Sequence, residues 1–94
     1  MQVWWLDPAL DAVAEIEAYV AERGGGDVAK RVAARLFDRS EQIGLFPYSG
    51  RSVPEYGDEH LREVFEGSYR IIYAVRSDAV EVVMVTHGAR SLDD

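Results

Sequence analysis

The run from residue 61 to residue 90 constrains the fold more than any other part of the chain. It holds three segments rich in β-branched and aromatic residues, at 61–66, 69–75 and 80–86. Gly67-Ser68 separates the first two segments, and residues 76–79 separate the second from the third. Such segments, interrupted by short turn-forming sequences, are typical of strands joined by tight hairpins. The run therefore predicts a three-stranded antiparallel meander.

The two turns also predict a register, which sorts the side chains of the meander into two faces. Val64 is expected opposite Ile71, and Val75 opposite Val80. The first face, expected to form the core, comprises Val64, Ile71, Tyr73, Val75, Val80, Val82 and Met84. The second face comprises Leu61, Glu63, Phe65, Arg70, Ile72, Ala74, Glu81, Val83, Val85 and His87. We expect function on the second face, because half-buried charges cost free energy unless they are paired or used.

The N-terminal segment predicts a strand followed by a helix. Residues 3–6 form a short apolar run in which the side chains of Trp4 and Trp5 would point to opposite faces. Asp7 is expected to cap an amphipathic helix that has Pro8 at its first position and ends at the glycines 24–26. One tryptophan would then enter the core, and the other would remain available for the open face or a partner.

A second amphipathic helix is expected from a cap at Asp27 to about Gly44. The short glycine connection predicts an antiparallel helical hairpin, and the apolar stripes of both helices would cover the first face of the sheet. The result is one α+β domain over residues 1–94 with two layers and the element order β-α-α-β-β-β. The second face would stay open.

Composition narrows the function classes. The chain has 94 residues, a formal net charge of −7 and no cysteine. The acidic balance opposes non-specific binding to nucleic acid, and the lack of thiols excludes disulfides and thiolate metal sites. No apolar run has the length of a membrane span and no signal-peptide pattern is present, so we expect a cytoplasmic protein without a membrane partner. We also expect no metal and no cofactor, because His60 and His87 lack the spacing of metal ligands.

Arg31, Arg35 and Arg39 recur every fourth residue and would form a basic stripe on the second helix. One interpretation is a docking surface for an acidic partner or for phosphates. The other is a solvated helix face, with Asp27 and Arg31 as a weak ion pair one turn apart.

Glu55, Arg70 and His87 are the candidate catalytic residues. A ribonuclease needs a base for the 2′-hydroxyl proton, a cation for the charge that develops on phosphorus, and an acid for the leaving oxygen. These three side chains supply that set if the sheet brings them together. The structural alternative is that Arg70 pairs with Glu63 or Glu81, while His87 satisfies a strand end.

Several motifs, taken together, resemble a known family. They are Ile43-x-x-x-Pro47-x-x-Gly50-Arg51, Leu61-Arg62-Glu63-Val64, Gly67-x-Tyr69-Arg70-Ile71-x-Tyr73 and Val85-x-His87-Gly88-x-Arg90. Their order and spacing, after an aromatic strand and a helical hairpin, resemble the RelE/ParE superfamily of toxins from bacterial type II toxin-antitoxin modules. The resemblance covers nearly the whole chain, and the Gly-Arg loop and the His-Gly-x-Arg ending look ParE-like.

The resemblance implies a cytoplasmic toxin that a cognate antitoxin neutralises in a hetero-oligomer. ParE-like members poison DNA gyrase without known catalytic residues, and this is the leading hypothesis. RelE-like members cleave mRNA on the ribosome, so a metal-independent endoribonuclease using Glu55, Arg70 and His87 is the alternative. A third hypothesis is a degenerate toxin that retains only antitoxin binding. The residues expected to contact a partner are Arg31, Arg35, Arg39, Arg51, Phe65, Ile72, Val83, Val85 and Arg90.

Overall fold

A computed structural model of the protein describes residues 1–89. The elements are β1 (Gln2–Trp5), α1 (Asp7–Gly24), α2 (Gly26–Leu45), β2 (Arg51–Ser52), β3 (Leu61–Glu66), β4 (Tyr69–Val75) and β5 (Ala79–His87). They form one sheet in the order β1-β5-β4-β3-β2, in which β1 runs parallel to β5 and the other neighbours are antiparallel. The predicted α+β architecture is confirmed, and the two-residue strand β2 is an addition to it.

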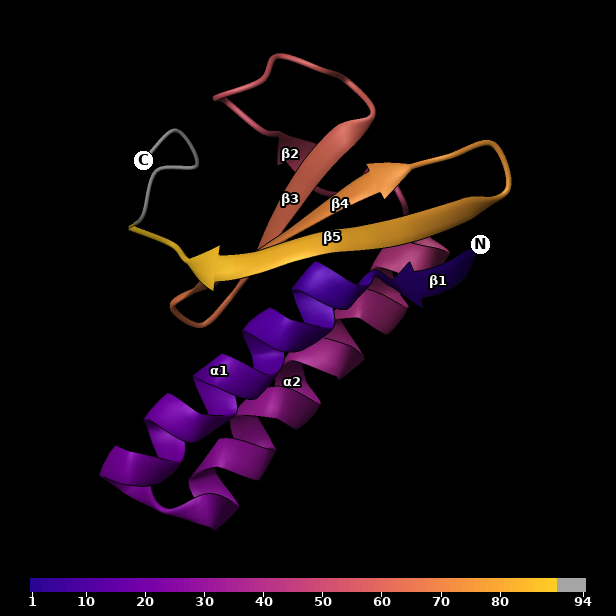
Figure 1. The fold of residues 1–94 in the computed structure, drawn as a ribbon. Helices are drawn as coiled ribbons and strands as arrows, with labels where there is room; N and C mark the ends of the chain where they lie inside the picture. Colours follow the sequence, from indigo (N-terminus) through magenta and orange to yellow (C-terminus); the bar gives the residue numbers. More distant parts are fainter. Residues whose placement is uncertain (90–94) are drawn as a thin grey trace.

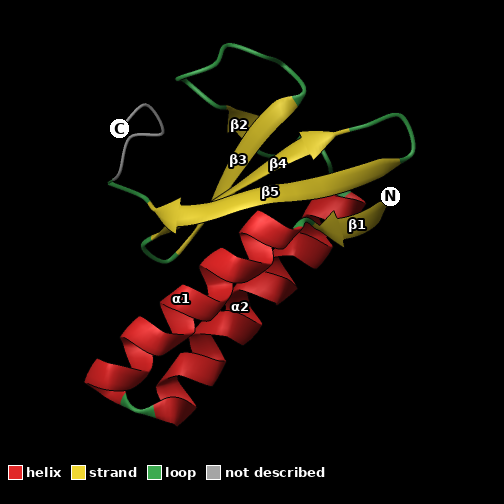
Figure 2. Ribbon diagram, viewed as in Figure 1, coloured by secondary structure: helices red, strands yellow, loops and turns green. Residues whose placement is uncertain are grey.

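The helical hairpin covers one face of the sheet only. Figure 1 shows α1 and α2 side by side beneath the strands, with the end that holds their connection reaching past the sheet. Figure 2 shows the loop between β2 and β3 on the opposite side, away from the helices. The core between the layers comprises Ala9, Val13, Ala33, Leu36, Ile43, Val64, Ile71, Tyr73, Val75, Val80, Val82 and Val85.

Helix α1 begins one residue before the predicted position, and α2 begins two residues before it. The carbonyl of Leu6 accepts from the N–H groups of Ala9 and Leu10, so Leu6 is the N-cap and Asp7 already belongs to α1. Gly25 ends α1 and also caps α2, with a φ of 88° that suits a residue without Cβ. The expected caps Asp7 and Asp27 therefore lie in the first turns, where their negative charges still favour the helix dipole.

The N-terminal strand is fixed by its tryptophans and by a close approach to α2. Trp5 turns inward, where its Nε1 donates to the buried Ser40 Oγ at 3.1 Å and its ring packs on Phe37. Trp4 points away and is exposed, as the alternation predicts. The terminal amino group donates to the carbonyl of Gly44 at 2.7 Å, and a Cβ at position 44 would lie 2.7 Å from the carbonyl oxygen of Met1. Glycine at this position lets β1 lie directly against the helix.

The hairpin registers agree with the sequence at both turns, but a β-bulge separates them. Val64 lies opposite Ile71, and Val75 lies opposite Val80, as predicted. Between them, Ile72 pairs with Met84 while Tyr73 pairs with Val82, which leaves Val83 as an extra residue in β5. An extra residue reverses the facing of every side chain that follows it.

Because of the bulge, three side chains lie on the opposite face of the sheet from the predicted one. Val85 belongs to the helix-covered core, and Met84 moves to the face of Ile72. His87, which lies opposite Tyr69, moves to the helix side as well. The shared face expected for Arg70 and His87 is thus not formed.

Candidate functional site

Four charged side chains meet on the sheet face away from the helices, and we call them the ionic cluster: Arg51, Glu55, Glu63 and Arg70. Arg70 Nη1 and Nη2 donate to Glu55 Oε2 and Oε1, each at 3.1 Å. Arg70 Nε donates to Glu63 Oε1 at 3.0 Å, and Nη2 also contacts this oxygen. Arg51 Nε donates to the other oxygen of Glu63 at 2.6 Å. Two guanidinium groups and two carboxylates are therefore joined in one network of charged hydrogen bonds.

Two members of the ionic cluster are almost fully buried, so their pairing affects the stability of the fold. Arg70 is 4% exposed and Glu63 only 1% exposed. Hydrogen bonding to Glu55, followed by the interactions with Glu63, raises the pKa of Arg70 above its ordinary value and outweighs burial, which alone would lower it. A charge buried to this degree is tolerated when it is paired and hydrogen-bonded, as Arg70 is.

The ionic cluster also fixes the loop that follows β2. Glu55 belongs to this loop, whereas Glu63 and Arg70 lie on β3 and β4. The loop returns over the sheet face that the helices leave uncovered, because Glu55 reaches Arg70 there (Figure 2). The open face predicted from the sequence is therefore partly covered by the subunit itself.

Tyr73 holds a different segment, the connection between α2 and β2, from the helix side. Its hydroxyl donates to the carbonyl of Pro47 at 2.7 Å and accepts from the N–H of Gly50 at 3.1 Å. A Cβ at position 50 would lie 2.6 Å from that hydroxyl and would also overlap the carbonyl oxygen of Glu63. Only glycine fits there, which gives the Gly50-Arg51 motif a steric reason: Gly50 lets the chain pass and Arg51 enters the ionic cluster.

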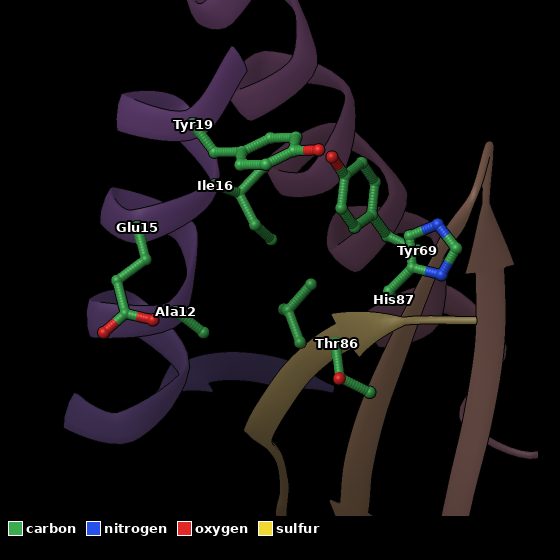
Figure 3. A pocket seen from close by; sticks show the side chains of 8 residues that line it. Ala12, Glu15, Ile16, Tyr19, Tyr69, Thr86 and His87 are labelled. Carbon is green, nitrogen blue, oxygen red and sulfur yellow. The ribbon is translucent and has the colours of Figure 1, made fainter. Parts of the chain in front are cut away.

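His87 lies on the other face, beside a groove between α1 and β5. Its ring packs edge-on against Tyr69 with a centroid distance of 6.1 Å. This α1–β5 groove has a volume of about 380 Å³ and is lined by Ala12, Glu15, Ile16, Tyr19, Tyr69, Val85, Thr86 and His87. Figure 3 shows the helix residues and the strand residues facing each other across it.

The structure thus brings two of the three candidate catalytic residues together. Glu55 and Arg70 form a bidentate pair, while the sheet separates both from His87. The structural alternative foreseen for Arg70 holds for Glu63; Glu81 pairs with Arg76 instead, at 2.8 Å. Residues 1–89 hold no group of three histidine or acidic side chains arranged to bind a metal ion.

Apart from the basic stripe on α2, the residues expected to bind a partner fall into three groups. Phe65 is 45% exposed beside Arg51, whose guanidinium lies 5.5 Å from its ring centre, and Val83 is half-buried at the bulge. Ile72 and Val85 are only 2% and 3% exposed: Ile72 is buried within the subunit and Val85 lies under the helices. Partner contact at these two residues stays a prediction. Arg90 lies outside the described residues.

The basic stripe on α2 is free of carboxylate partners within residues 1–89. Arg31 and Arg35 are exposed, and Arg39 is half-buried and donates to the Gln42 side chain at 2.9 Å. The ion pair expected between Asp27 and Arg31 is not formed.

Neither helix in the described residues 1–89 is apolar enough over a sufficient length to cross a membrane.

Sequence reasoning missed the α1–β5 groove and the role of Arg51 in the ionic cluster. The groove depends on Val85 and His87 facing α1, and this follows from the bulge at Val83, for which the run of valines in β5 gives no local signal. A polar signal for the ionic cluster was present, since Glu63 and Arg70 flank a hairpin and Glu55 precedes it.

Comparison with known proteins identifies the family. Residues 3–92 match the family described as the ParE toxin of the type II toxin-antitoxin system, parDE. The chain belongs to the ParE toxin family. The match to this ParE family extends from the N-terminal strand through the His-Gly-x-Arg motif at the end of the chain, so it includes both the ionic cluster and the α1–β5 groove.

The ParE fold also recurs in a solved structure. A chain from the chromosomal ParDE TA system from P. aeruginosa superposes with a TM-score of 0.80, covering 93% of this chain and 95% of that chain. Sequence identity is 11%, so this similarity supports the fold alone. A search of curated protein sequences finds no match.

Proposed function

We propose that this ParE-family protein is the toxin of a type II toxin-antitoxin pair, that it acts in the cytoplasm by inhibiting DNA gyrase, and that a cognate antitoxin neutralises it in a hetero-oligomer. Membership of the ParE family is the observation that carries this proposal. Inhibition would proceed through protein–protein contact.

The state of Arg70 supports a binding mechanism over RNA cleavage. Arg70 is 4% exposed and both terminal nitrogens of its guanidinium donate to carboxylates, so a phosphate would have to displace an internal anion. His87 lies across the sheet from it. The net charge of −7 adds an unfavourable field for a phosphate backbone.

A gyrase cleavage assay tests the proposal. Purified toxin is incubated with gyrase, ATP and supercoiled plasmid, and the reaction is stopped with detergent and protease. We expect linear DNA from stabilised double-strand breaks, and we expect its loss when the toxin is first mixed with antitoxin. Unchanged supercoiling and no linear DNA at a large excess of folded toxin would contradict gyrase inhibition.

Ribosome-dependent mRNA cleavage is the second candidate, because Glu55 and Arg70 do lie together. Toeprinting on programmed ribosomes is the test, with His87→Ala as the informative variant since His87 is exposed and its loss leaves the ionic cluster intact. Cuts in the ribosomal A site that disappear in this variant would favour the endonuclease. Absence of cuts with the native toxin would remove that candidate.

The antitoxin is expected to carry an acidic segment for the basic stripe of α2. Arg31 and Arg35 are exposed and have no carboxylate partner among the described residues. Exchanging Arg35 for glutamate should weaken the complex about tenfold at low salt. Lys30→Glu makes the same charge change off the stripe and serves as the matched control. Equal losses in the two variants would mean that the stripe is no specific contact.

We propose further contacts with the antitoxin at Arg51, Phe65 and Val83.

A further inference from the structure

Large apolar side chains are exposed where α2 ends, at the opposite end of the helical hairpin from the connection between the helices (Figure 1). Leu45 is 73% exposed, Phe46 67%, Met1 52% and Tyr48 50%. Leu45, Phe46 and Tyr48 line one shallow hollow of about 460 Å³, and Met1 lines neighbouring hollows with Leu45 and with Tyr48. The four side chains therefore form one continuous surface, which we call the apolar end.

The apolar end has the extent of the centre of a protein–protein interface. Aromatic side chains offer about 150–250 Å² each, and leucine and methionine somewhat less, so the exposed fractions leave roughly 400 Å² of mainly apolar surface. A standard interface covers about 800 Å² on each partner, of which a little more than half is apolar. A patch of this extent on a small monomer is typical of a contact surface.

The segment that carries the apolar end is held in a fixed conformation. The Tyr73 hydroxyl donates to the carbonyl of Pro47 and accepts from the N–H of Gly50. The Tyr48 hydroxyl is hydrogen-bonded to His60 Nδ1 at 2.9 Å. Because a rigid surface loses little conformational entropy on association, these bonds favour docking at the apolar end.

The apolar end is flanked by charges of opposite sign. Glu41 lies one helical turn before Leu45 and lines a hollow with it; it is exposed and forms no hydrogen bond or ion pair within residues 1–89. Beside Tyr48, the guanidinium of Arg62 lies 4.9 Å from the ring centre and donates to backbone carbonyls. Arg62 has no carboxylate partner in this part of the chain. A strongly acidic partner would be repelled by Glu41, and a strongly basic partner by Arg62.

A second copy of the chain complements both charges. When a surface meets itself across a two-fold axis, each contact occurs twice, so Glu41 of one copy faces Arg62 of the other. We propose that two copies of this protein associate through the apolar end, with Leu45 and Phe46 at the centre and Glu41–Arg62 ion pairs at the rim. The charge of −7 on each copy opposes association. The dimer is therefore weak, with a dissociation constant of about 10–100 µM.

Sedimentation velocity of the full-length protein tests dimer formation. We expect the sedimentation coefficient to rise from the monomer value to the dimer value between about 1 µM and about 500 µM, because association follows mass action. A monomer at every concentration in this range overturns the proposal.

Two leucine substitutions test whether the apolar end is the contact. Leu45→Glu places a charge at its centre, and we expect the dissociation constant to rise about tenfold or more. Leu10→Glu makes the same change at an exposed position of α1 and should alter it less than about twofold. Phe46→Ser, which adds no charge at the helix end, should weaken the dimer like Leu45→Glu. Equal dissociation constants in all three variants would place the contact elsewhere and overturn the proposal; circular dichroism verifies that they are folded.

A pair of charge reversals tests the two-fold arrangement. Glu41→Lys and Glu15→Lys each change an exposed helix residue and lower the net negative charge equally, which by itself favours association. Only Glu41→Lys sets a second cation against Arg62. We expect Glu41→Lys to raise the dissociation constant about fivefold at low salt, and Glu15→Lys to leave it unchanged or lower it. Stronger association of both variants would refute the ion pairs at the rim.

A gyrase contact at the same surface would give a different result. If the protein remains a monomer and Leu45→Glu, but not Leu10→Glu, abolishes the gyrase cleavage described above, the apolar end belongs to that target and the dimer is overturned. The dimer does not depend on gyrase inhibition. A native protein that dimerises through the apolar end without affecting gyrase would contradict the proposed function alone.

Discussion

The guanidinium of Arg70 on β4 donates a hydrogen bond to each carboxylate oxygen of Glu55, with Nη1–Oε2 and Nη2–Oε1 distances of 3.1 Å. Glu55 lies in the loop before β3, so this pair ties an irregular segment to the middle of the sheet. Glu63 completes the arrangement from β3 and also binds Arg51. Glu55 and Arg70, which are catalytic candidates by sequence, therefore hold the loop on the sheet. We expect their substitution to lower the stability of the fold.

Glu63→Gln should destabilise the fold strongly. The substitution keeps the shape of the side chain but removes the charge that faces Arg51 and Arg70 and turns part of the group into a donor. Breaking a buried ion pair from one side costs about 3 kcal/mol or more of unfolding free energy, because the remaining charge is left partly uncompensated. Urea denaturation followed by circular dichroism measures the change.

Glu66→Gln is the matched control for that variant. Glu66 lies on the same strand, is half-buried and has no hydrogen bond or ion pair within residues 1–89. We expect a change of less than about 0.5 kcal/mol. Similar losses for the two variants would mean that the ionic cluster contributes little beyond ordinary surface charge.

Glu55→Gln should loosen the loop more than the sheet. The N–H groups of Tyr56 and Gly57 donate to the carbonyl of Val53, and these bonds depend on the loop staying in place. Without the charged pair to Arg70, we expect these two amides to exchange several-fold faster, while amides between β4 and β5 keep their rates. Glu59→Gln, in the same loop but exposed, should leave both sets unchanged. Uniformly faster exchange would indicate global destabilisation instead.

Gly50→Ala should destabilise the protein by about 2 kcal/mol or more, because the new methyl group would overlap the Tyr73 hydroxyl and the backbone of β3. Gly26→Ala is the control: a Cβ there meets nothing within 4 Å, at the start of α2. We expect it to be neutral or stabilising by up to about 1 kcal/mol. Thermal unfolding of both variants is sufficient, and a tolerated Gly50→Ala would refute the steric role of this glycine.

Tyr73 should make stability fall at alkaline pH. Burial raises the pKa of its phenol above the ordinary 10.0, against smaller opposing effects led by the Gly50 N–H. Above about pH 10 the unfolded chain loses this proton while the folded chain retains it, so the unfolding free energy decreases as pH rises toward the folded-state pKa. The contribution is fully present below the unfolded-state pKa.

Tyr73→Phe isolates that effect. Removing the hydroxyl leaves the Gly50 N–H and the Pro47 carbonyl without this partner, at a cost of about 1–3 kcal/mol near neutral pH. Because the variant lacks the titrating group, its deficit relative to the native protein should shrink between about pH 9 and about pH 11. A constant deficit over this range would contradict the raised pKa of Tyr73.

Local chemistry in the sequence was sufficient for every element except the two-residue strand β2, and for the hairpin turns. The glycines at 24–26 separate two helices, Gly67-Ser68 and residues 76–79 close the hairpins, and the register next to each turn is as predicted. Turn geometry fixes the pairing of the nearest residues, and apolar periodicity fixes the face that a helix buries. A carboxylate partner for Arg70 was also predicted, but the sequence left Glu63 and Glu81 as alternatives, and the structure shows Glu63.

Only the tertiary structure decided which side chains share a surface beyond the turns. The bulge at Val83 leaves the hairpin ends unchanged but turns Val85 and His87 toward α1, away from Arg70. Residues on either side of the bulge are all apolar, so no alternation in the sequence reveals it. The fold of the loop that carries Glu55 likewise depends on a side chain fifteen residues later. The amino-acid sequence thus determined the elements through short-range contacts, whereas packing across the sheet determined the surfaces.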